Sequence, residues 1–478
     1  MELLCVMIVP FLAALAALAW RDNRRRPLLL PAAGAIHAAC TLRLLRAPSA
    51  PLPDAWLSLD ALGLLLLALS SVLFLGCAIY GVEYLRRREE RDNRLFVACY
   101  LFMLAAASAV AASRHLGLMW IAMEATTLSV APLIHFKRSD RSLEATWKYL
   151  IMGSVGIGLA LLGTYFLALA ASGSSGGGYT LHLDDLLSLG PRLSVPWLKG
   201  AFIFMLVGYG LKMGLAPLHS WKPDAYGEAP GMAGAALAGV LTGCSFLGLL
   251  RVYQICAAAG QLDFAKDLLV LMGLLSLATA AAFMVSQKDF KRLLAYSSVE
   301  HMGLLALGLG LGGGGLFAAL LHFINNGLAK GVLFLTAGNI HRAFGDKTLG
   351  RVHGALRRVP VSATLFLLGF IAITGSPPFG LFLSEFLLLQ AAVAAGRWAV
   401  ALAVVGFLAM IFFGMAGTAF SVAQGDPPDE PVRPGQGDSL LTTMVPGAFA
   451  LALLVLGLYI PAWLTSRLTG AASLLGAP

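Results

Sequence analysis

The sequence predicts an all-α protein that crosses a lipid bilayer about 14 times, taking about 20 apolar residues as one crossing. Of the 478 residues, 58% are hydrophobic and 12% are charged, and the mean hydropathy is +0.80. A soluble domain usually has about 25% charged residues, so this chain has too few charges to cover a water-facing surface of its size. The composition therefore excludes a soluble enzyme.

Long apolar runs give the order of the predicted helices. The segments are approximately 3–20, 27–46, 56–84, 95–113, 116–136, 149–171, 197–219, 230–253, 265–287, 293–312, 315–340, 359–388, 396–420 and 441–466. The first run begins with Glu2 and no basic residue, and Arg21 follows it. A secretory signal has the opposite pattern, so we expect this run to be a retained span.

The positions of lysine and arginine predict which loops face the cytoplasm. Of the 34 cations, 23 fall in loops after odd-numbered spans, including Lys222 after the seventh, and nine fall in loops after even-numbered spans or in the C-terminal tail. By the positive-inside rule, the odd loops are cytoplasmic and both termini face outward. The basic excess is thus a topology signal, and nucleic-acid binding is not needed to explain it. The two remaining cations, Lys212 and Lys330, lie inside apolar spans.

The cysteines give no indication of a metal or a disulfide. All six stand singly, mostly in apolar runs, at Cys5, Cys40, Cys77, Cys99, Cys244 and Cys256. No CxxC pair and no Cys/His cluster has the spacing of metal ligands, so small buried side chains are the better interpretation. We expect neither a metal site nor a cofactor in this chain, and any redox centres belong to other chains.

Five ionisable residues lie within the predicted spans: Glu124, Lys212, His322, Lys330 and Glu385. A charge near the bilayer centre is costly, so such residues usually face a protein interior or a wet cavity and mark ion or proton paths. The alternative is a fixed ion pair that only holds helices together, above all for Glu124 with Lys212. Five such groups in one chain favour proton translocation, because packing requires none of them.

Three further polar residues lie at the ends of predicted spans. Glu300 and His301 follow the basic cluster Lys288–Arg292, close enough to the cytoplasmic face to take or pass on protons, with a hydrogen-bonded structural role as the alternative. Asp60 opens the third span, and its position predicts a helix N-cap.

A motif around proline occurs twice. The Gly, aromatic, Gly, Pro pattern of Gly208–Pro217 recurs in Gly369–Pro378 at an offset of 161 residues. The two copies lie in spans seven and twelve and so run in opposite directions, as in the inverted repeats of transporters. Pro217 and the pair Pro377-Pro378 predict two broken helices. The predicted organisation is an N-terminal three-helix segment (1–94), a first five-helix repeat (95–253), a second, inverted repeat (265–420) and a C-terminal helix (441–478).

Several of these features occur together in a known family. Glu124, the run Lys212–Pro230, the segment Ala295–Ser298, and His322 with Lys330 resemble the antiporter-like membrane subunits of respiratory complex I, Mrp-type cation/proton antiporters and group 4 membrane-bound hydrogenases.

The resemblance covers about residues 55–420, and the run from Lys212 is its most specific part. Within the family, Glu300-His301 and the segment Gly375–Phe386 look most like component F of hydrogenase-4.

This resemblance implies roles for individual residues. Glu124 and Lys212 would be the coupling pair, His322 and Lys330 part of a central polar axis, and Glu385 the terminal proton-handling residue. Further candidates for the proton pathway are His219, Thr242, Ser245, Glu300 and His301.

One departure from the family concerns span eight. Many relatives have a lysine there, but the matching position here is Gly243. The proton pathway between Lys212 and His322 would then run through water, Thr242 or Ser245, or the coupling between the two residues would be weaker.

The leading hypothesis is a non-catalytic, proton-translocating subunit of a redox-driven membrane complex similar to hydrogenase-4. The resemblance implies other antiporter-like and small membrane subunits as partners, together with a soluble iron–sulfur and nickel–iron arm, and no cofactor in this chain. It also implies a multi-pass protein of the prokaryotic cytoplasmic membrane. Two alternatives stay open: a subunit of a sodium/proton antiporter without a redox partner, and a structural membrane anchor with an inactive axis.

Overall fold

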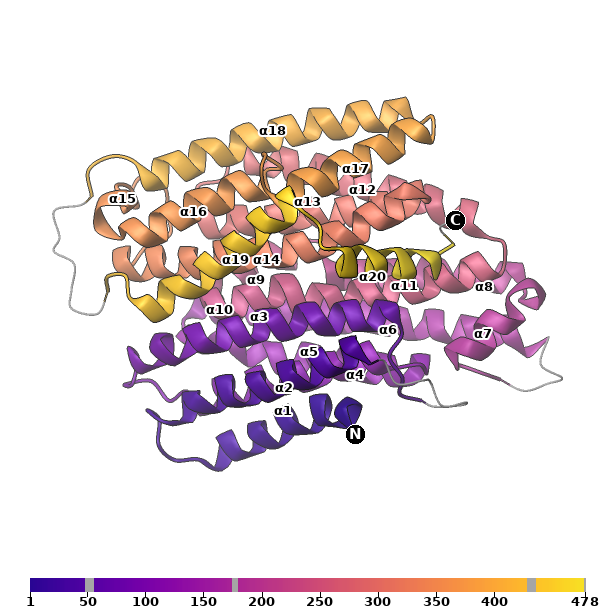
Figure 1. The fold of residues 1–478 in the computed structure, drawn as a ribbon, viewed down its shortest axis with the longest axis horizontal. Helices are drawn as coiled ribbons and strands as arrows, with labels where there is room; N and C mark the ends of the chain where they lie inside the picture. The colour runs from indigo at the N-terminus through magenta and orange to yellow at the C-terminus, as the bar shows by residue number, and fades with distance from the viewer. Residues whose placement is uncertain (48–55, 174–178, 428–435, 477–478) are drawn as a thin grey trace.

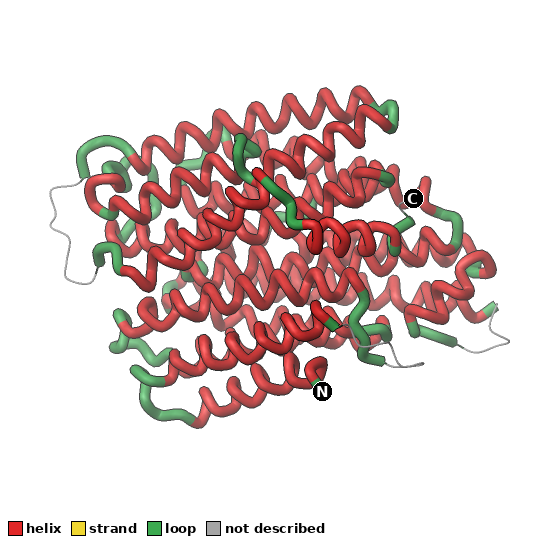
Figure 2. Tube along the Cα trace, viewed as in Figure 1, coloured by secondary structure: helices red, strands yellow, loops and turns green. Residues whose placement is uncertain are grey.

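Helices form almost all of the regular structure, as the hydropathy predicts. The computed structural model describes residues 1–47, 56–173, 179–427 and 436–476, and this part of the chain contains no β-strand beyond three isolated bridges (Figure 2). The helices are α1 (Glu2–Ala19), α2 (Leu29–Arg46), α3 (Ala61–Arg86), α4 (Arg94–Ala112), α5 (Leu116–Ile134), α6 (Asp140–Ser172), α7 (Leu183–Leu189), α8 (Val195–Met213), α9 (Trp221–Glu228), α10 (Gly231–Ala236), α11 (Thr242–Ala258), α12 (Leu262–Met284), α13 (Phe290–Leu311), α14 (Gly314–Phe344), α15 (Ala355–Arg358), α16 (Pro360–Ile373), α17 (Gly380–Ala394), α18 (Trp398–Ala423), α19 (Leu440–Leu458) and α20 (Ala462–Ser473).

The predicted all-α, polytopic fold class is confirmed. Among the described residues, 12 segments are long and apolar enough to cross a membrane, and α16 and α17 are shorter apolar helices. Each predicted span contains a helix; α7 and α15 lie outside the predicted spans, α9 begins just past the end of the seventh, and α20 begins inside the fourteenth. In lipid, a backbone must satisfy its own hydrogen bonds, which is why the apolar runs become helices.

Both predicted breaks are present. The seventh span divides into α8 and α9, where Gly214 ends α8 in the left-handed region with φ of 77°. The twelfth divides into α16 and α17, and Gly375 at the break has φ of 63°. The peptide bonds before Pro217 and Pro378 are both cis. Ionisable residues lie beside both breaks: Lys212 and Lys222 flank the first, and Glu385 lies against Gly375 at the second.

The bundle has a polar centre and an apolar periphery. Figure 1 shows the helices side by side, with α1 and α2 at one edge and α18 at the other. Helices α11, α13 and α14 are buried along nearly their whole length, whereas α18 exposes large apolar side chains such as Leu402 and Phe413. An outer surface of this kind suits contact with lipid.

Asp60 caps α3, as predicted, and also forms ion pairs. Its carboxylate accepts a hydrogen bond from the Gly63 backbone N–H at 2.9 Å. It also pairs with Arg251 of α11 and, at 3.1 Å, with Arg114. Burial alone raises the pKa of Asp60, but the ion pairs and the cap outweigh burial and hold it at about 2.

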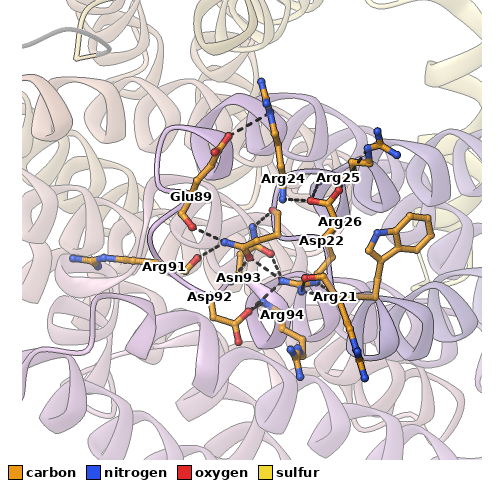
Figure 3. A network of polar contacts seen from close by, with 12 residues as sticks. Arg21, Asp22, Arg24, Arg25, Arg26, Glu89, Arg91, Asp92, Asn93 and Arg94 are labelled. Carbon is orange, nitrogen blue, oxygen red and sulfur yellow. Dashed lines mark hydrogen bonds and ion pairs between the residues drawn. The ribbon is translucent and has the colours of Figure 1, made fainter.

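The basic loops gather at one end of the bundle, where the α1–α2 and α3–α4 connections meet (Figure 1). Figure 3 shows their contacts. The Arg26 side chain is buried and donates to the Trp20 carbonyl at 2.7 Å and to Asn93 Oδ1 at 2.6 Å, and the Asn93 side chain in turn donates to the Asn23 carbonyl at 2.8 Å. Some of the cations that predicted topology therefore also join the two loops.

Candidate functional site

Glu124 and Lys212 lie on neighbouring helices, but no direct ion pair joins them in the described residues. Lys212 is buried near the end of α8, and its ammonium donates to the Met123 carbonyl, to Thr126 Oγ1 at 3.1 Å and to Thr127 Oγ1 at 2.6 Å. Thr126 donates its own proton to the Met123 carbonyl, so its oxygen is free to accept. Glu124, one residue along α5, attracts Lys212 electrostatically, and its Oε2 has no hydrogen-bond partner.

Lys222, which the pattern of apolar runs predicted in the loop after the seventh span, is a buried lysine on a helix, so that prediction was wrong. It lies on α9, just beyond the break, with no exposed surface. Its stem packs against Gly214, where a Cβ would collide with it. Its ammonium donates to Ser298 Oγ at 3.0 Å. The short polar run around the break resembles a loop in the sequence, whereas the structure turns it back into the bundle.

Lys330 is held in the same way by the neighbouring serine. Its ammonium donates to Ser297 Oγ at 2.9 Å and to the Leu294 carbonyl at 3.2 Å. Ser297 and Ser298 are consecutive on α13, so this pair brings Lys222 and Lys330 close enough to repel each other electrostatically. The segment Ala295–Ser298, which carries part of the family resemblance, thus supplies the hydroxyl acceptors of two buried amines.

Glu300 lies between the pair of lysines, Lys222 and Lys330, and a group formed by two histidines and Glu385. It is buried on α13 and attracts Lys330, while it repels Glu385 of α17. The next residue, His301, has Nδ1 3.0 Å from His322 Nε2, and His322 Nδ1 is 2.9 Å from Ser384 Oγ. Three helices therefore bring Glu300, His301, His322 and Glu385 together.

In the described residues, no hydrogen bond joins Thr242 or Ser245 to Lys212 or to His322. Thr242 donates to the Ala238 carbonyl at 2.6 Å and Ser245 to the Leu241 carbonyl at 3.2 Å, both on their own helix. At Gly243 a Cβ would lie 2.9 Å from side-chain carbons of Leu66 and of Phe323. Apolar packing therefore fills the position at which the resemblance predicts a lysine.

His219 lies in the break between α8 and α9, half-buried. Its ring lies near the aromatic rings of Phe283 and Tyr296, with centroid distances of 6.3 and 6.0 Å. Its Nδ1 has no hydrogen-bond partner, and no hydrogen bond in the described residues joins it to Lys212.

The geometry gives a row of titratable groups through the centre of the bundle, of which Glu124 is half-buried and all the others are buried. Glu124 and Lys212 form its first part, Lys222 and Lys330 its middle, and the Glu300 group its last part. Each amine rests on hydroxyl and carbonyl oxygens, which accept hydrogen bonds without fixing a charge. Such groups can exchange protons with water molecules or with one another once they are brought within hydrogen-bond distance.

Comparison with known proteins identifies the family. Residues 113–411 match the family described as NADH:quinone oxidoreductase/Mrp antiporter, transmembrane. The chain belongs to this family. It is therefore an integral membrane protein of the antiporter-like type, and the resemblance stated from the motifs is confirmed.

Individual relatives agree with this assignment. The chain is 33% identical to a hydrogenase-4 component F homolog of Methylacidiphilum infernorum, over 86% of each chain. It is 32% identical to NADH-quinone oxidoreductase subunit N of Desulforudis audaxviator, over 85% of this chain and 81% of the relative. In fold it resembles a chain of the Mrp complex from Dietzia sp., with a TM-score of 0.87 at 20% identity over 98% and 96% of the two chains. Its structural neighbours are chains of complexes with several subunits.

Proposed function

We propose that this antiporter-like subunit carries protons through the membrane within a redox-driven complex, along the row of titratable groups that begins at Glu124. The observation that supports the proposal is the row itself: three lysines, three carboxylates and two histidines, all within the bundle. A structural anchor does not need them, because each buried charge costs stability that apolar packing would not. The names of the two relatives, a hydrogenase-4 component and a quinone oxidoreductase subunit, support a redox complex.

Each part of the row receives a role in this proposal. Glu124 and Lys212 act as the coupling pair, Lys330 and His322 carry the central axis, and Glu385 is the terminal proton-handling residue. Lys222 extends the axis between Lys212 and Lys330, since Gly243 leaves span eight without an amine. Residues 95–253 and 265–420 are the two inverted repeats, placed between the segment 1–94 and the helix of 441–478.

The test of this function uses Lys212. In the assembled complex, Lys212→Ala is expected to abolish redox-driven proton uptake into proteoliposomes while the subunits still purify together. Lys199→Ala, at the other end of α8, is the matched control and keeps wild-type uptake. Unchanged pumping by the Lys212 variant would reject the proposal.

Partners and placement belong to the same proposal. The redox chemistry is supplied by a soluble arm with iron–sulfur and nickel–iron centres, and the membrane is the prokaryotic cytoplasmic membrane with the basic loops inside and both termini outside. Purification with such an arm supports this function. Purification with small membrane proteins alone favours the second candidate, a cation/proton antiporter subunit, which the fold shared with the Mrp complex supports.

A further inference from the structure

The last group of the row has the composition of a metal site. His301 of α13, His322 of α14 and Glu385 of α17 each place one ligand atom within 4.8 Å of the others, and all three side chains are buried. Two imidazoles and one carboxylate are ligands that Zn²⁺ commonly takes in proteins. The three residues come from three different helices, and therefore no local spacing in the sequence indicates the site.

The hydrogen bonds of His322 determine its tautomer, and therefore which ring nitrogen can bind an ion. Ser384 Oγ donates its proton to the Leu381 carbonyl at 3.0 Å, so it accepts from His322 Nδ1–H. The lone pair of neutral His322 is then on Nε2, which faces His301 Nδ1 at 3.0 Å. Two nitrogen ligands of a tetrahedral Zn²⁺ lie about 3.3 Å apart, given Zn–N bonds of about 2.0–2.1 Å. A shift of a few tenths of an ångström would admit the ion.

Without an ion, three buried polar atoms of this group make no hydrogen bond. They are Glu385 Oε1, His301 Nε2 and Glu300 Oε2. When His301 Nδ1 donates to His322, its Nε2 carries a lone pair that points towards Glu300 Oε2, 3.9 Å away. Two acceptors then face each other, which is unfavourable in a buried site.

An ion would pair all three atoms at once. If His301 Nδ1 binds the metal, the ring proton is carried on Nε2, and a shift of about 0.7 Å brings Nε2 from 3.9 Å to hydrogen-bond distance of Glu300 Oε2. This is the carboxylate–histidine–metal arrangement that orients histidine ligands in zinc sites. Glu385 Oε1 becomes the third ligand, and Glu385 and Glu300 both attract the ion, whereas Lys330, which also faces Glu300, repels it. We propose that His301, His322 and Glu385 form a Zn²⁺ site, with Glu300 supporting His301.

The site is close to the outside of the chain. Glu385 lies against Gly375, where a Cβ would collide with its carboxylate. Gly375 belongs to the break between α16 and α17, in which Pro377 and Pro378 are exposed. Glu385 is accordingly the most exposed of the three ligands, at 7%, whereas His301 and His322 have no exposed surface. If the proposed proton function is correct, a bound Zn²⁺ also stops transfer between the two imidazoles.

Metal binding is tested without measuring transport. The purified full-length chain, free of any histidine tag, is titrated with Co²⁺, which gives a strong visible absorption at a tetrahedral site, and Zn²⁺ is then added to displace it. We expect one saturable site in the wild type, and at least tenfold weaker binding in Glu385→Gln and in His301→Gln. His37→Gln is the matched control, because His37 is equally buried but its two ring nitrogens bond to Ser71 and Ser108.

Thermal unfolding of each variant without metal identifies any that fails to fold, and Zn²⁺ should raise the midpoint of the wild type and of His37→Gln alone. Wild-type protein without a saturable site, or Glu385→Gln and His301→Gln with wild-type affinity, would overturn the site. Neither result bears on Lys212→Ala, so the two proposals can fail separately.

Discussion

Replacing Lys222 by methionine is expected to slow proton translocation at least about a hundredfold, the lower range for loss of a positioned proton-transfer group. Methionine keeps the unbranched stem that packs against Gly214, and it removes only the amine. The stability effect follows from the contacts. The variant loses a hydrogen bond to Ser298, about 1 kcal/mol, and it no longer buries an ammonium that has no carboxylate partner, which costs several kcal/mol. The thermal midpoint should therefore stay the same or rise.

The assay compares redox-driven proton uptake and thermal unfolding of the same purified complex. Lys288→Met is the control, because Lys288 is an exposed lysine at the same end of the bundle. Uptake within twofold of wild type would refute the place of Lys222 in the row. A lower midpoint together with lower uptake would show that Lys222 is a structural residue.

Three further predictions concern neighbouring sites. Thr127→Val removes the 2.6 Å acceptor of Lys212 and should slow proton uptake about fivefold, since one hydrogen bond is worth about 1 kcal/mol. Gly243→Ala should lower the thermal midpoint by an equivalent of about 1–3 kcal/mol, because a Cβ would collide with two apolar side chains. Asp60→Asn should cost about 3 kcal/mol at pH 7 by leaving Arg251 buried without its partner. Because the folded pKa of about 2 lies below the ordinary pKa of Asp, about 3.9, this difference should shrink as the pH falls from about 4 to about 2.

The helices and the breaks could be predicted because each depends on local sequence. An apolar run in lipid has to be helical, and a proline inside such a run removes a backbone hydrogen bond and favours a break, although α1, α5 and α19 continue through Pro10, Pro132 and Pro446. The prediction of the C-terminal span was less accurate. The predicted helix of 441–466 ends at Leu458, and α20 begins beyond Pro461, so the proline at its end was the signal for two helices.

The candidate site could be predicted only where a charge interrupts an apolar run. Lys212 and Lys330 stand out in this way. Lys222 does not, because it lies in a polar run beside a break, and hydropathy cannot distinguish a loop outside the membrane from a chain that turns back into the bundle. Its partner Ser298 lies 76 residues away, and such contacts are set by tertiary packing, as are those that join His301, His322 and Glu385.

The three buried lysines share an arrangement that favours transport over a purely structural role. In the described residues, none of Lys212, Lys222 and Lys330 forms a direct ion pair with a carboxylate, although Glu124 and Glu300 are near enough to attract Lys212 and Lys330. A structural salt bridge gains its stability from close contact, and at about 4 Å the attraction reaches about 4 kcal/mol in a protein environment. A proton bound in such a pair would be held tightly. Separating the charges and resting each amine on hydroxyl and carbonyl oxygens weakens that hold, so a change in charge or position of one carboxylate can alter the state of the neighbouring amine.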